Sequence, residues 1–190
     1  MNIGLYGGSF DPVHLGHLLL AHAAHEEAGL DRLFFIPAAQ SPFKPGRQMA
    51  PPAARCQLLR LALQGLSWAE VDEQEIRRGG VSYTIDTVKA YAARYPEARL
   101  SYMVGADNVP MLSQWRQADE LARLVDFLVI PRPGEVAPVL PKPFKGRILK
   151  GTPIDISSSV VRSRIAEGRE VAHLLPPGVA EAIANNRLYL

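Results

Sequence analysis

The stretch GGSFDPVHLGH, residues 7–17, decides the fold, because it connects an apolar strand to a helix through a loop suited to anions. The apolar residues before it predict a short buried strand over 2–6, and the residues after it predict a helix over 15–28 that stops at Gly29. In open parallel sheets, ligands bind at the carboxyl ends of such strands. The two leading glycines let backbone N–H groups approach a bulky anion, and the helix start adds free N–H groups and a positive dipole end. The stretch therefore predicts a phosphate site.

Two histidines sharpen this prediction. His14 and His17 lie three residues apart at the expected helix start, so they face nearly the same way and can both donate hydrogen bonds to phosphate oxygens. Gly16 between them leaves room for a flat ring or a sugar. A zinc site competes, because His22 and His25 follow on the same helix, but His14 and His25 would lie roughly 16 Å apart along its axis. No thiolate lies nearby either, so we expect no protein metal site and assign His22 and His25 to the surface or to packing.

A dinucleotide-binding loop and a plain structural turn both fit the opening stretch less well. The dinucleotide-binding fingerprint needs the pattern GxGxxG, which the stretch does not contain. A plain turn accounts for Gly-Gly and Asp-Pro but not for the His-Leu-Gly-His that follows. Asp11 suits a turn with Pro12 as well as a weak contact to a metal ion on the phosphates, and both roles stay open.

A second stretch with the features of an anion site is DISSSVVRSRI, residues 155–165. Its three consecutive serines predict the N-cap of a helix over 158–166, whose start offers the same N–H groups and dipole. Arg162 lies one turn inside that helix and can reach forward to the same anion. Arg164 lies about 200° further round the helix and should face elsewhere. A capped helix with solvated arginines accounts for these residues equally well when the stretch is taken alone.

The bulk composition is that of an ordinary globular domain. The chain has 190 residues, is 47% hydrophobic, and carries a formal net charge of +2. This length suits a single domain over 1–190, and the charge is too small to imply a nucleic-acid partner. We find no signal-peptide pattern and no apolar run of roughly 18 residues, so we expect no membrane segment and a cytoplasmic location. Cys56, the single cysteine, predicts a packed thiol, and a homo-oligomer is left open.

Apolar runs alternate with helical patterns along the chain. We expect strands at 2–6, 31–37, 68–71, 99–104, 126–130 and 147–149, and helices at 15–28, 51–64, 84–95, 120–124, 158–166 and 179–185. Parallel strands that are buried on both faces read as near-continuous apolar runs, as DFLVI at 126–130 does. The order therefore predicts the α/β class, with a Rossmann-like open parallel sheet and helices on both faces.

Together, the two anion stretches resemble the nucleotidylyltransferase superfamily, with its HxGH motif at 14–17 and its ISSxxxR motif at 156–162. Over nearly its whole length the chain further resembles the bacterial nicotinate-nucleotide adenylyltransferase family. Ser159 stands where that family often has Thr, and SPFK lacks a second proline before Lys44; both departures keep the functional group. The other matching stretches, in the family's order, are IPAAQSPFK (36–44), GGVSYTIDTV (79–88), MVGADN (103–108) followed by Trp115, VIPRPG (129–134) and the ending NNRLYL.

The resemblance implies transfer of the AMP part of ATP to nicotinate mononucleotide, with release of pyrophosphate. The attacking phosphate oxygen is already ionised at pH 7, so positioning and charge stabilisation would supply the catalysis. The resemblance places the catalytic contacts at His14, His17, Lys44 and Arg162. It places ATP binding at Gly7, Gly8, Ser9, Phe10, Gly105, Asp107, Ile156, Ser157 and Ser158. It places binding of the second substrate at Ser82, Tyr83, Thr84 and Trp115.

The same resemblance suggests how the small molecules are held. Mg²⁺ is expected as the ATP complex, bound mainly by phosphate oxygens and waters. Thr84 opens a helix and would bind the pyridine carboxylate through its hydroxyl and its backbone N–H, while Trp115 would offer an aromatic face. Asp107 and Asn108 would lie near the nucleotide sugar or the entry to the site. A helix N-cap role for Asp107 and a core-packing role for Trp115 remain open.

Three competing functions share part of this pattern. A phosphopantetheine adenylyltransferase shares both phosphate motifs, but GGVSYTIDT and MVGADN followed by Trp115 favour the nicotinate enzyme. A class I aminoacyl-tRNA synthetase uses an HxGH-type motif, but this chain is too short to add a tRNA-binding domain and has no basic surface run. A non-catalytic regulator would keep the nucleotide pocket and would not depend on His17 for its role.

Overall fold

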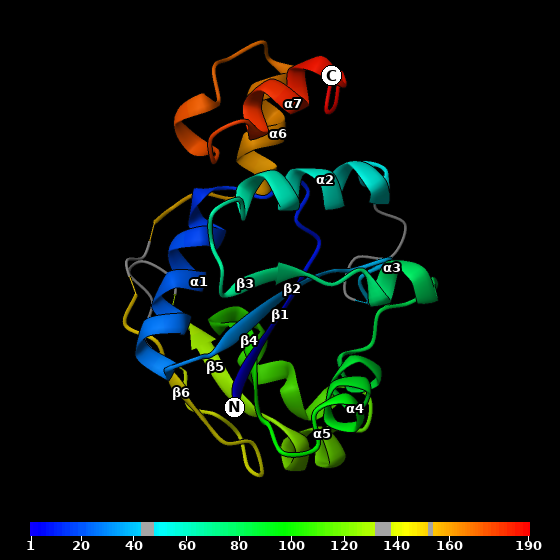
Figure 1. The fold of residues 1–190 in the computed structure, drawn as a ribbon, viewed down its shortest axis with the longest axis vertical. Helices are drawn as coiled ribbons and strands as arrows, with labels where there is room; N and C mark the ends of the chain where they lie inside the picture. The colour runs from blue at the N-terminus through cyan, green and yellow to red at the C-terminus, as the bar shows by residue number, and fades with distance from the viewer. Residues whose placement is uncertain (43–47, 132–137, 152–153) are drawn as a thin grey trace.

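The computed structural model describes residues 1–42, 48–131, 138–151 and 154–190. Within these ranges the strands are β1 (Asn2–Gly8), β2 (Arg32–Pro37), β3 (Ala69–Val71), β4 (Arg99–Gly105), β5 (Asp126–Ile130) and β6 (Gly146–Ile148). They form one sheet in the order β3-β2-β1-β4-β5-β6, and all neighbouring strands pair in parallel (Figure 1). The expected open parallel sheet is confirmed.

Helices connect and cover these strands. The α-helices are α1 (Leu15–Ala28), α2 (Pro52–Ala62), α3 (Gln74–Arg78), α4 (Thr84–Arg94), α5 (Ala118–Leu124), α6 (Ser158–Ala166) and α7 (Val179–Asn185). Two 3₁₀ helices, η1 (Ala106–Gln114) and η2 (Ala172–Leu174), complete the described elements. The expected strands and helices all appear, and most ends lie within two residues of the expected ones. α3 and both 3₁₀ helices were not expected from the sequence.

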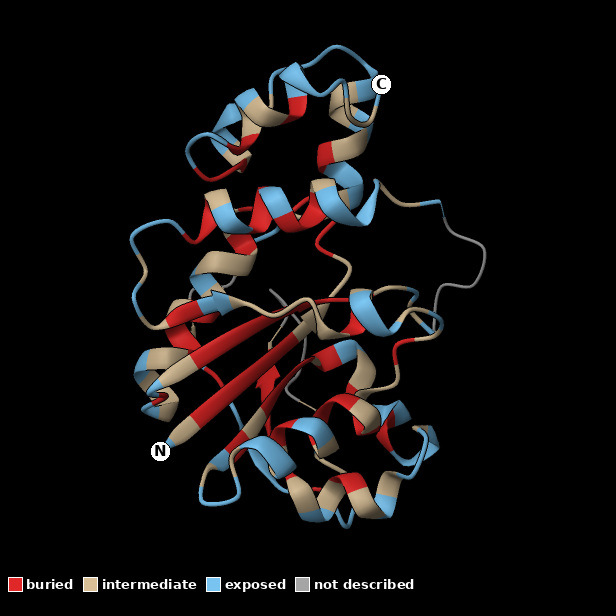
Figure 2. Cartoon of the chain, turned by 45° about the vertical axis from the view of Figure 1, so that its right-hand side comes forward, coloured by how far each residue is buried: buried red, intermediate tan, exposed pale blue. Residues whose placement is uncertain are grey.

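Both faces of the sheet are buried, because side chains alternate along each strand. On β1, Ile3 and Leu5 pack with α4, η1 and α5, whereas Tyr6 packs on the opposite face with α1 and α2. On β5, Phe127 and Leu128 divide between the same two faces. Buried positions accordingly run along the central strands in Figure 2, and α6 and α7 lie beyond α2 at the C-terminal end of the chain in Figure 1. The expectation of helices on both faces is confirmed.

The strand order places a crevice beside the opening motif. From β1 the chain passes through α1 to β2 on one side, whereas β4 lies on the other side and begins the second half of the sheet. Loops that leave the carboxyl ends of β1 and β4 therefore diverge, and the space between them is the usual ligand position in such sheets. Gly8 ends β1 and Gly105 ends β4, so the loops that follow both strands begin at this crevice.

Among the described residues, none of the helices has the length and apolar character required to cross a membrane. Cys56 is free and buried in α2, which confirms the packed thiol expected from the sequence.

Candidate active site

Two adjoining cavities open at the carboxyl ends of β1 and β4. We call the larger one, of about 530 Å³, the histidine cavity, because His14 and His17 line it. We call the smaller one, of about 140 Å³, the tryptophan cavity, because Trp115 lines it. The two share the lining residues Gly7, Ser9, Met103 and Gly105. Two ligands bound in these cavities would therefore meet over the ends of the two strands.

The structure brings most of the predicted site residues to these cavities. Gly8 lines only the tryptophan cavity, and Tyr83 and Arg162 line neither cavity. Lys44 lies outside the described residues. Three of the residues predicted to bind the second substrate line the tryptophan cavity: Ser82, Thr84 and Trp115. The histidine cavity is lined by Gly7, Ser9, Phe10, His14, His17, Gly105, Asp107, Ile156, Ser157 and Ser158 among those predicted for the phosphates and for ATP.

His14 and His17 form a close pair at the start of α1. Their ring centroids are 3.7 Å apart, and the backbone N–H of His14 donates to Nδ1 of His17 over 3.1 Å. Because Nδ1 of His17 accepts, the proton of the neutral ring sits on Nε2, which is then a donor. The ring packs against Phe10, with centroids 5.0 Å apart. Gly16 gives this arrangement room, because a Cβ there would lie 3.0 Å from Nδ1 of His14.

Burial keeps both imidazoles neutral in the ligand-free protein. It lowers the pKa of His14 from 6.5 to about 4. It also lowers the pKa of His17 well below 6.5, with the nearby His14 as a second cause. Neutral imidazoles still donate one hydrogen bond each, and a bound polyanion would favour the protonated form. The pair is thus suited to stabilise negative charge that develops on a phosphate, and it supplies no nucleophile.

The low pKa of His14 predicts a loss of stability in acid. In the unfolded chain His14 takes up a proton below pH 6.5, whereas in the folded protein it does so only near pH 4. The free energy of unfolding therefore falls as the pH drops from 6.5 to about 4. At pH 4 the loss from this one group is on the order of 3 kcal/mol. We expect urea unfolding of the wild type and of His14→Gln to show this extra loss in the wild type alone. Equal pH dependence of the two proteins would contradict the assignment.

The start of α6 is tied to the loop of the opening motif. The hydroxyl of Ser158 donates to the carbonyl of Pro12 over 2.9 Å, and the guanidinium of Arg162 donates to the carbonyl of Asp11 over 2.6 Å. The Ser157 hydroxyl accepts from the N–H of Val160 and caps the helix. Two helix starts that lie far apart in the sequence therefore border one cavity. Arg162 is engaged with the loop here, so its contact with phosphate stays a prediction.

The remaining histidines of α1 and Arg164 lie away from the cavities. His25 stacks on Trp68 with ring centroids 4.3 Å apart, and His22 meets the edge of the same indole. This confirms their assignment to packing. Arg164 donates to the carbonyl of Glu170, so it faces away from the anion site as expected.

Arg55, which no sequence pattern indicated, is the main support of the loop. Its side chain is 1% exposed and donates to three backbone carbonyls: Ser9 at 2.7 Å, Ala38 at 2.8 Å and Ala50 at 3.2 Å. Asp11, also buried, accepts from the backbone N–H of Ala50 over 3.1 Å. This network fixes the loop after β1 to the segments after β2 and before α2. A lone arginine in a helical pattern carries no sequence signal for such a role.

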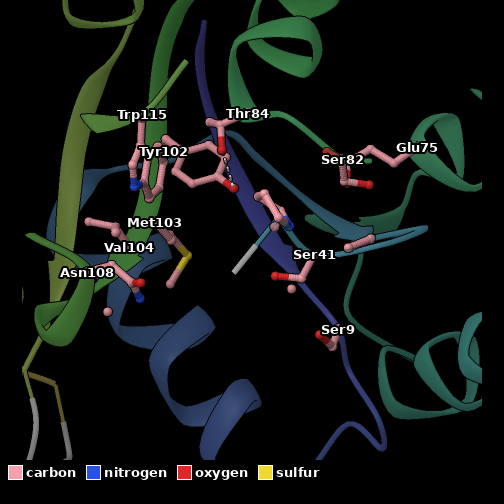
Figure 3. A pocket seen from close by; sticks show the side chains of 15 residues that line it. Ser9, Ser41, Glu75, Ser82, Thr84, Tyr102, Met103, Val104, Asn108 and Trp115 are labelled. Carbon is pink, nitrogen blue, oxygen red and sulfur yellow. Dashed lines mark hydrogen bonds between the residues drawn. The ribbon is translucent and has the colours of Figure 1, made fainter. Parts of the chain in front are cut away.

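The tryptophan cavity is built around an aromatic corner (Figure 3). Trp115 and Tyr102 meet edge to face with ring centroids 6.2 Å apart, and the hydroxyl of Thr84 donates to that of Tyr102 over 3.4 Å. Gly7 leaves room for this corner, because a Cβ there would lie 2.2 Å from the Tyr102 hydroxyl oxygen and the ring would have to move. Tyr83 points elsewhere and carries the Arg116 guanidinium over its ring. An aromatic face and a helix start together suit a flat, negatively substituted ring.

Asp107 and Asn108 follow β4 and divide between the two cavities. Asp107 lines the histidine cavity and Asn108 lines the tryptophan cavity. Both belong to the first turn of η1, whose N-cap is Gly105, so the alternative of an N-cap role for Asp107 is wrong. Tyr102, Met103 and Glu75 also line the tryptophan cavity and were not expected there. Tyr102 and Met103 lie in the apolar run of β4, which by itself indicates only a buried strand.

Comparisons with known proteins find relatives in sequence and in fold. The family model described as cytidylyltransferase-like matches residues 5–164. A probable nicotinate-nucleotide adenylyltransferase of Gemmatimonas aurantiaca is 40% identical over 100% of this chain and 92% of its own length. A protein of the same name from Opitutus terrae is 38% identical over 100% of this chain and 98% of its own. The solved nicotinic acid mononucleotide adenylyltransferase of Plasmodium falciparum, complexed with NaAD, has the same fold, with a TM-score of 0.80 at 18% identity over 99% of this chain and 97% of that one.

Proposed function

The chain belongs to the nicotinate-nucleotide adenylyltransferase family of cytidylyltransferase-like proteins, and we propose that it joins the AMP part of ATP to nicotinate mononucleotide. The products are nicotinate adenine dinucleotide and pyrophosphate, which places the enzyme in NAD biosynthesis. The observation that carries this function is the pair of adjoining cavities, which share a floor at the ends of β1 and β4. One cavity has the donors for a triphosphate, and the other has an aromatic face and a helix start for a pyridine carboxylate.

The reaction is a displacement at the α-phosphorus of ATP. A phosphate oxygen of nicotinate mononucleotide attacks the α-phosphorus. The bond between the α-phosphorus and the oxygen that bridges it to the β-phosphorus breaks, and pyrophosphate leaves with the electron pair of that bond. The attacking oxygen is already an anion, so no side chain has to remove a proton. His17, through Nε2–H, and His14 stabilise charge on the α-phosphate as it builds in the transition state. Catalysis then rests on placing the two substrates in line over Gly7 and Gly105.

The other predicted residues hold the two ends of ATP. Ser157 and Ser158, with the free N–H groups at the start of α6, bind the β- and γ-phosphates. Lys44 and Arg162 add positive charge to the leaving pyrophosphate, and Arg162 can do this by exchanging its bond to Asp11 for one to phosphate. The N–H groups of the glycine loop bind the α-phosphate side. The placement of the helix starts and the charges of the side chains support these roles, and the role of Lys44 rests on the resemblance to the family alone.

Nicotinate mononucleotide fills the tryptophan cavity. Its pyridine ring packs on the indole of Trp115, and its carboxylate accepts hydrogen bonds at the start of α4 from the backbone N–H of Thr84 and from the Thr84 hydroxyl, which exchanges its bond to Tyr102 for one to the substrate. A helix start offers donors only, so it favours a carboxylate, whose two oxygens both accept, over a carboxamide, which has a single acceptor oxygen, no charge and an NH2 group that would face one of the donors. The selection between acid and amide thus needs no charged side chain at the ring.

Mg²⁺ enters as the ATP complex. The described residues contain no group of three or more acidic, histidine or cysteine side chains that could form a metal site. Asp11 does not fit as a direct ligand, because its carboxylate accepts from Ala50 and lies 3.8 Å from the Arg162 guanidinium. We propose that the ion would be held mainly by phosphate oxygens and water, where it would neutralise phosphate charge. We also propose a cytoplasmic location, where ATP is available and a free thiol such as Cys56 persists.

The proposed function is tested by measuring pyrophosphate release with ATP and each of three acceptors: nicotinate mononucleotide, nicotinamide mononucleotide and phosphopantetheine. We expect turnover with the nicotinate compound and a kcat/KM at least about tenfold lower with the amide, because the amide lacks the negative charge and offers one acceptor oxygen where the acid offers two. Product formation from phosphopantetheine alone would overturn the function. ATP binding without turnover on any acceptor would favour the regulator.

A further inference from the structure

Glu75 is a buried acid beside the tryptophan cavity that the proposed reaction does not use. It lies in α3, its residue is 4% exposed, and it lines the cavity together with Ser82 and Thr84. Figure 3 shows Glu75 beside Ser82, on the opposite side of the cavity from Trp115. A carboxyl in this position is costly to bury unless its oxygens accept hydrogen bonds. Its partners therefore indicate what it does.

Two hydroxyl groups donate to Glu75. Thr87, which is fully buried in the first turn of α4, donates to a carboxylate oxygen of Glu75 over 2.5 Å. Ser82, just before α4, also forms a side-chain hydrogen bond with Glu75. Each hydroxyl accepts from a further group: Thr87 from Arg78 at 3.5 Å, and Ser82 from the backbone N–H of Ala39 at 3.0 Å. The hydroxyl protons are therefore directed at the carboxyl group.

These contacts join three segments that surround the second substrate. Glu75 lies in α3, Ser82 and Thr87 lie at the start of α4, and Ala39 follows β2. Thr84 lies between the two hydroxyl residues that Glu75 holds. Its position, and the direction of the free N–H groups at the helix start, are therefore set by Glu75. The hydroxyl groups that donate to Glu75 belong to the start of α4, so a role for this carboxyl group would act through that helix.

We propose that Glu75 is a positioning residue for nicotinate mononucleotide: by accepting from Ser82 and Thr87, it holds the start of α4 where that helix start binds the pyridine carboxylate. This inference rests on the proposed function, because it names the same substrate. The charged and titratable groups around Glu75 are Arg78 on its own helix, Asp72 after β3 and Tyr102 on β4. Burial raises the pKa of Glu75 above 4.5, while the hydrogen bonds from Thr87 and Ser82 and the charge of Arg78 act against that rise.

Steady-state kinetics of Glu75→Ala and Glu75→Gln test the inference, with each substrate varied while the other is saturating. In Glu75→Ala both hydroxyls lose their acceptor, so we expect the KM for nicotinate mononucleotide to rise about tenfold or more, as small displacements of a binding group do. The KM for ATP should change less than about threefold, because the histidine cavity is built by other elements. Glu75→Gln keeps one acceptor oxygen and should fall between Glu75→Ala and the wild type.

Two further variants keep the test decisive. Glu73→Gln removes a carboxylate two residues away that pairs with Arg60 outside both cavities, and it should leave both KM values unchanged. Thr87→Val removes one hydroxyl with little change in volume, so it should raise the KM for nicotinate mononucleotide even if Glu75→Ala fails to fold.

A fall in stability or in kcat with both KM values unchanged would overturn the positioning role, as would an equal rise of both. If the wild type makes no dinucleotide from nicotinate mononucleotide, the proposed function fails and this inference fails with it. If the wild type makes the dinucleotide but the variants do not show the selective rise in KM, the inference about Glu75 fails and the proposed function stands.

Discussion

His17→Ala is expected to lower kcat by about 10²–10³-fold, the usual cost of removing one donor that stabilises transition-state charge. The Nε2–H of His17 is held in its tautomer by the N–H of His14, and the ring is fixed against Phe10. Its bond to the α-phosphate strengthens only as charge builds there. The affinity for ATP should therefore change by less than about fivefold, because most of the triphosphate contacts remain.

The measurement combines single-turnover rates with calorimetric ATP binding. His22→Ala is the matched control, because it removes an imidazole from the same helix that packs at the edge of Trp68 outside the histidine cavity. We expect wild-type kcat for this control. Retained turnover in His17→Ala, or a loss fully explained by weaker ATP binding, would contradict the assigned role.

Arg55→Met is expected to lower the free energy of unfolding by about 3–5 kcal/mol, near the upper limit for a single substitution. Methionine fills much of the volume but donates no hydrogen bond. The carbonyls of Ser9, Ala38 and Ala50 would then lose the guanidinium donors that now reach them inside the protein. Asp11 would also lose a nearby positive charge. The loop after β1 should become mobile before the rest of the protein unfolds, because Ser9 and Asp11 belong to it.

Urea unfolding at pH 7 measures this effect, with Arg60→Met as the control on the same helix. Arg60 is mostly exposed and pairs with Glu73, so its loss should cost less than about 1 kcal/mol. A similar small cost for both variants would show that the three carbonyls find water or other donors. In that case Arg55 would not be the support of the loop.

The sheet could be predicted because its strands carry their own signal. DFLVI predicts β5 at the residues it occupies, since a run of mostly apolar, β-forming residues matches a strand that is buried on both faces. α3 was missed because it is short and charged, in a run that reads as exposed chain. η1 was missed because Pro110 argues against a helix; there the burial of Val109 and Leu112 outweighs local preference.

The same distinction holds for the candidate site. His14, His17 and the serines at 157–158 could be placed together, because helix starts after parallel strands meet at one sheet edge. Arg55 and Glu75 could not, since a charged residue in a helical pattern is usually solvated. Their partners are backbone carbonyls and hydroxyls from distant parts of the chain, such as the carbonyl of Ser9, 46 residues before Arg55. Only the packed structure shows that these charges point inward.

The central claim is that the starts of α1 and α6 hold one triphosphate between them. A crystal structure with a non-hydrolysable ATP analogue and Mg²⁺ tests it most directly. We expect phosphate oxygens within hydrogen-bond distance of both His17 and the segment 157–159, with the α-phosphate over Gly7. A triphosphate that contacts only one of the two helix starts, or that lies outside the histidine cavity, would contradict the account.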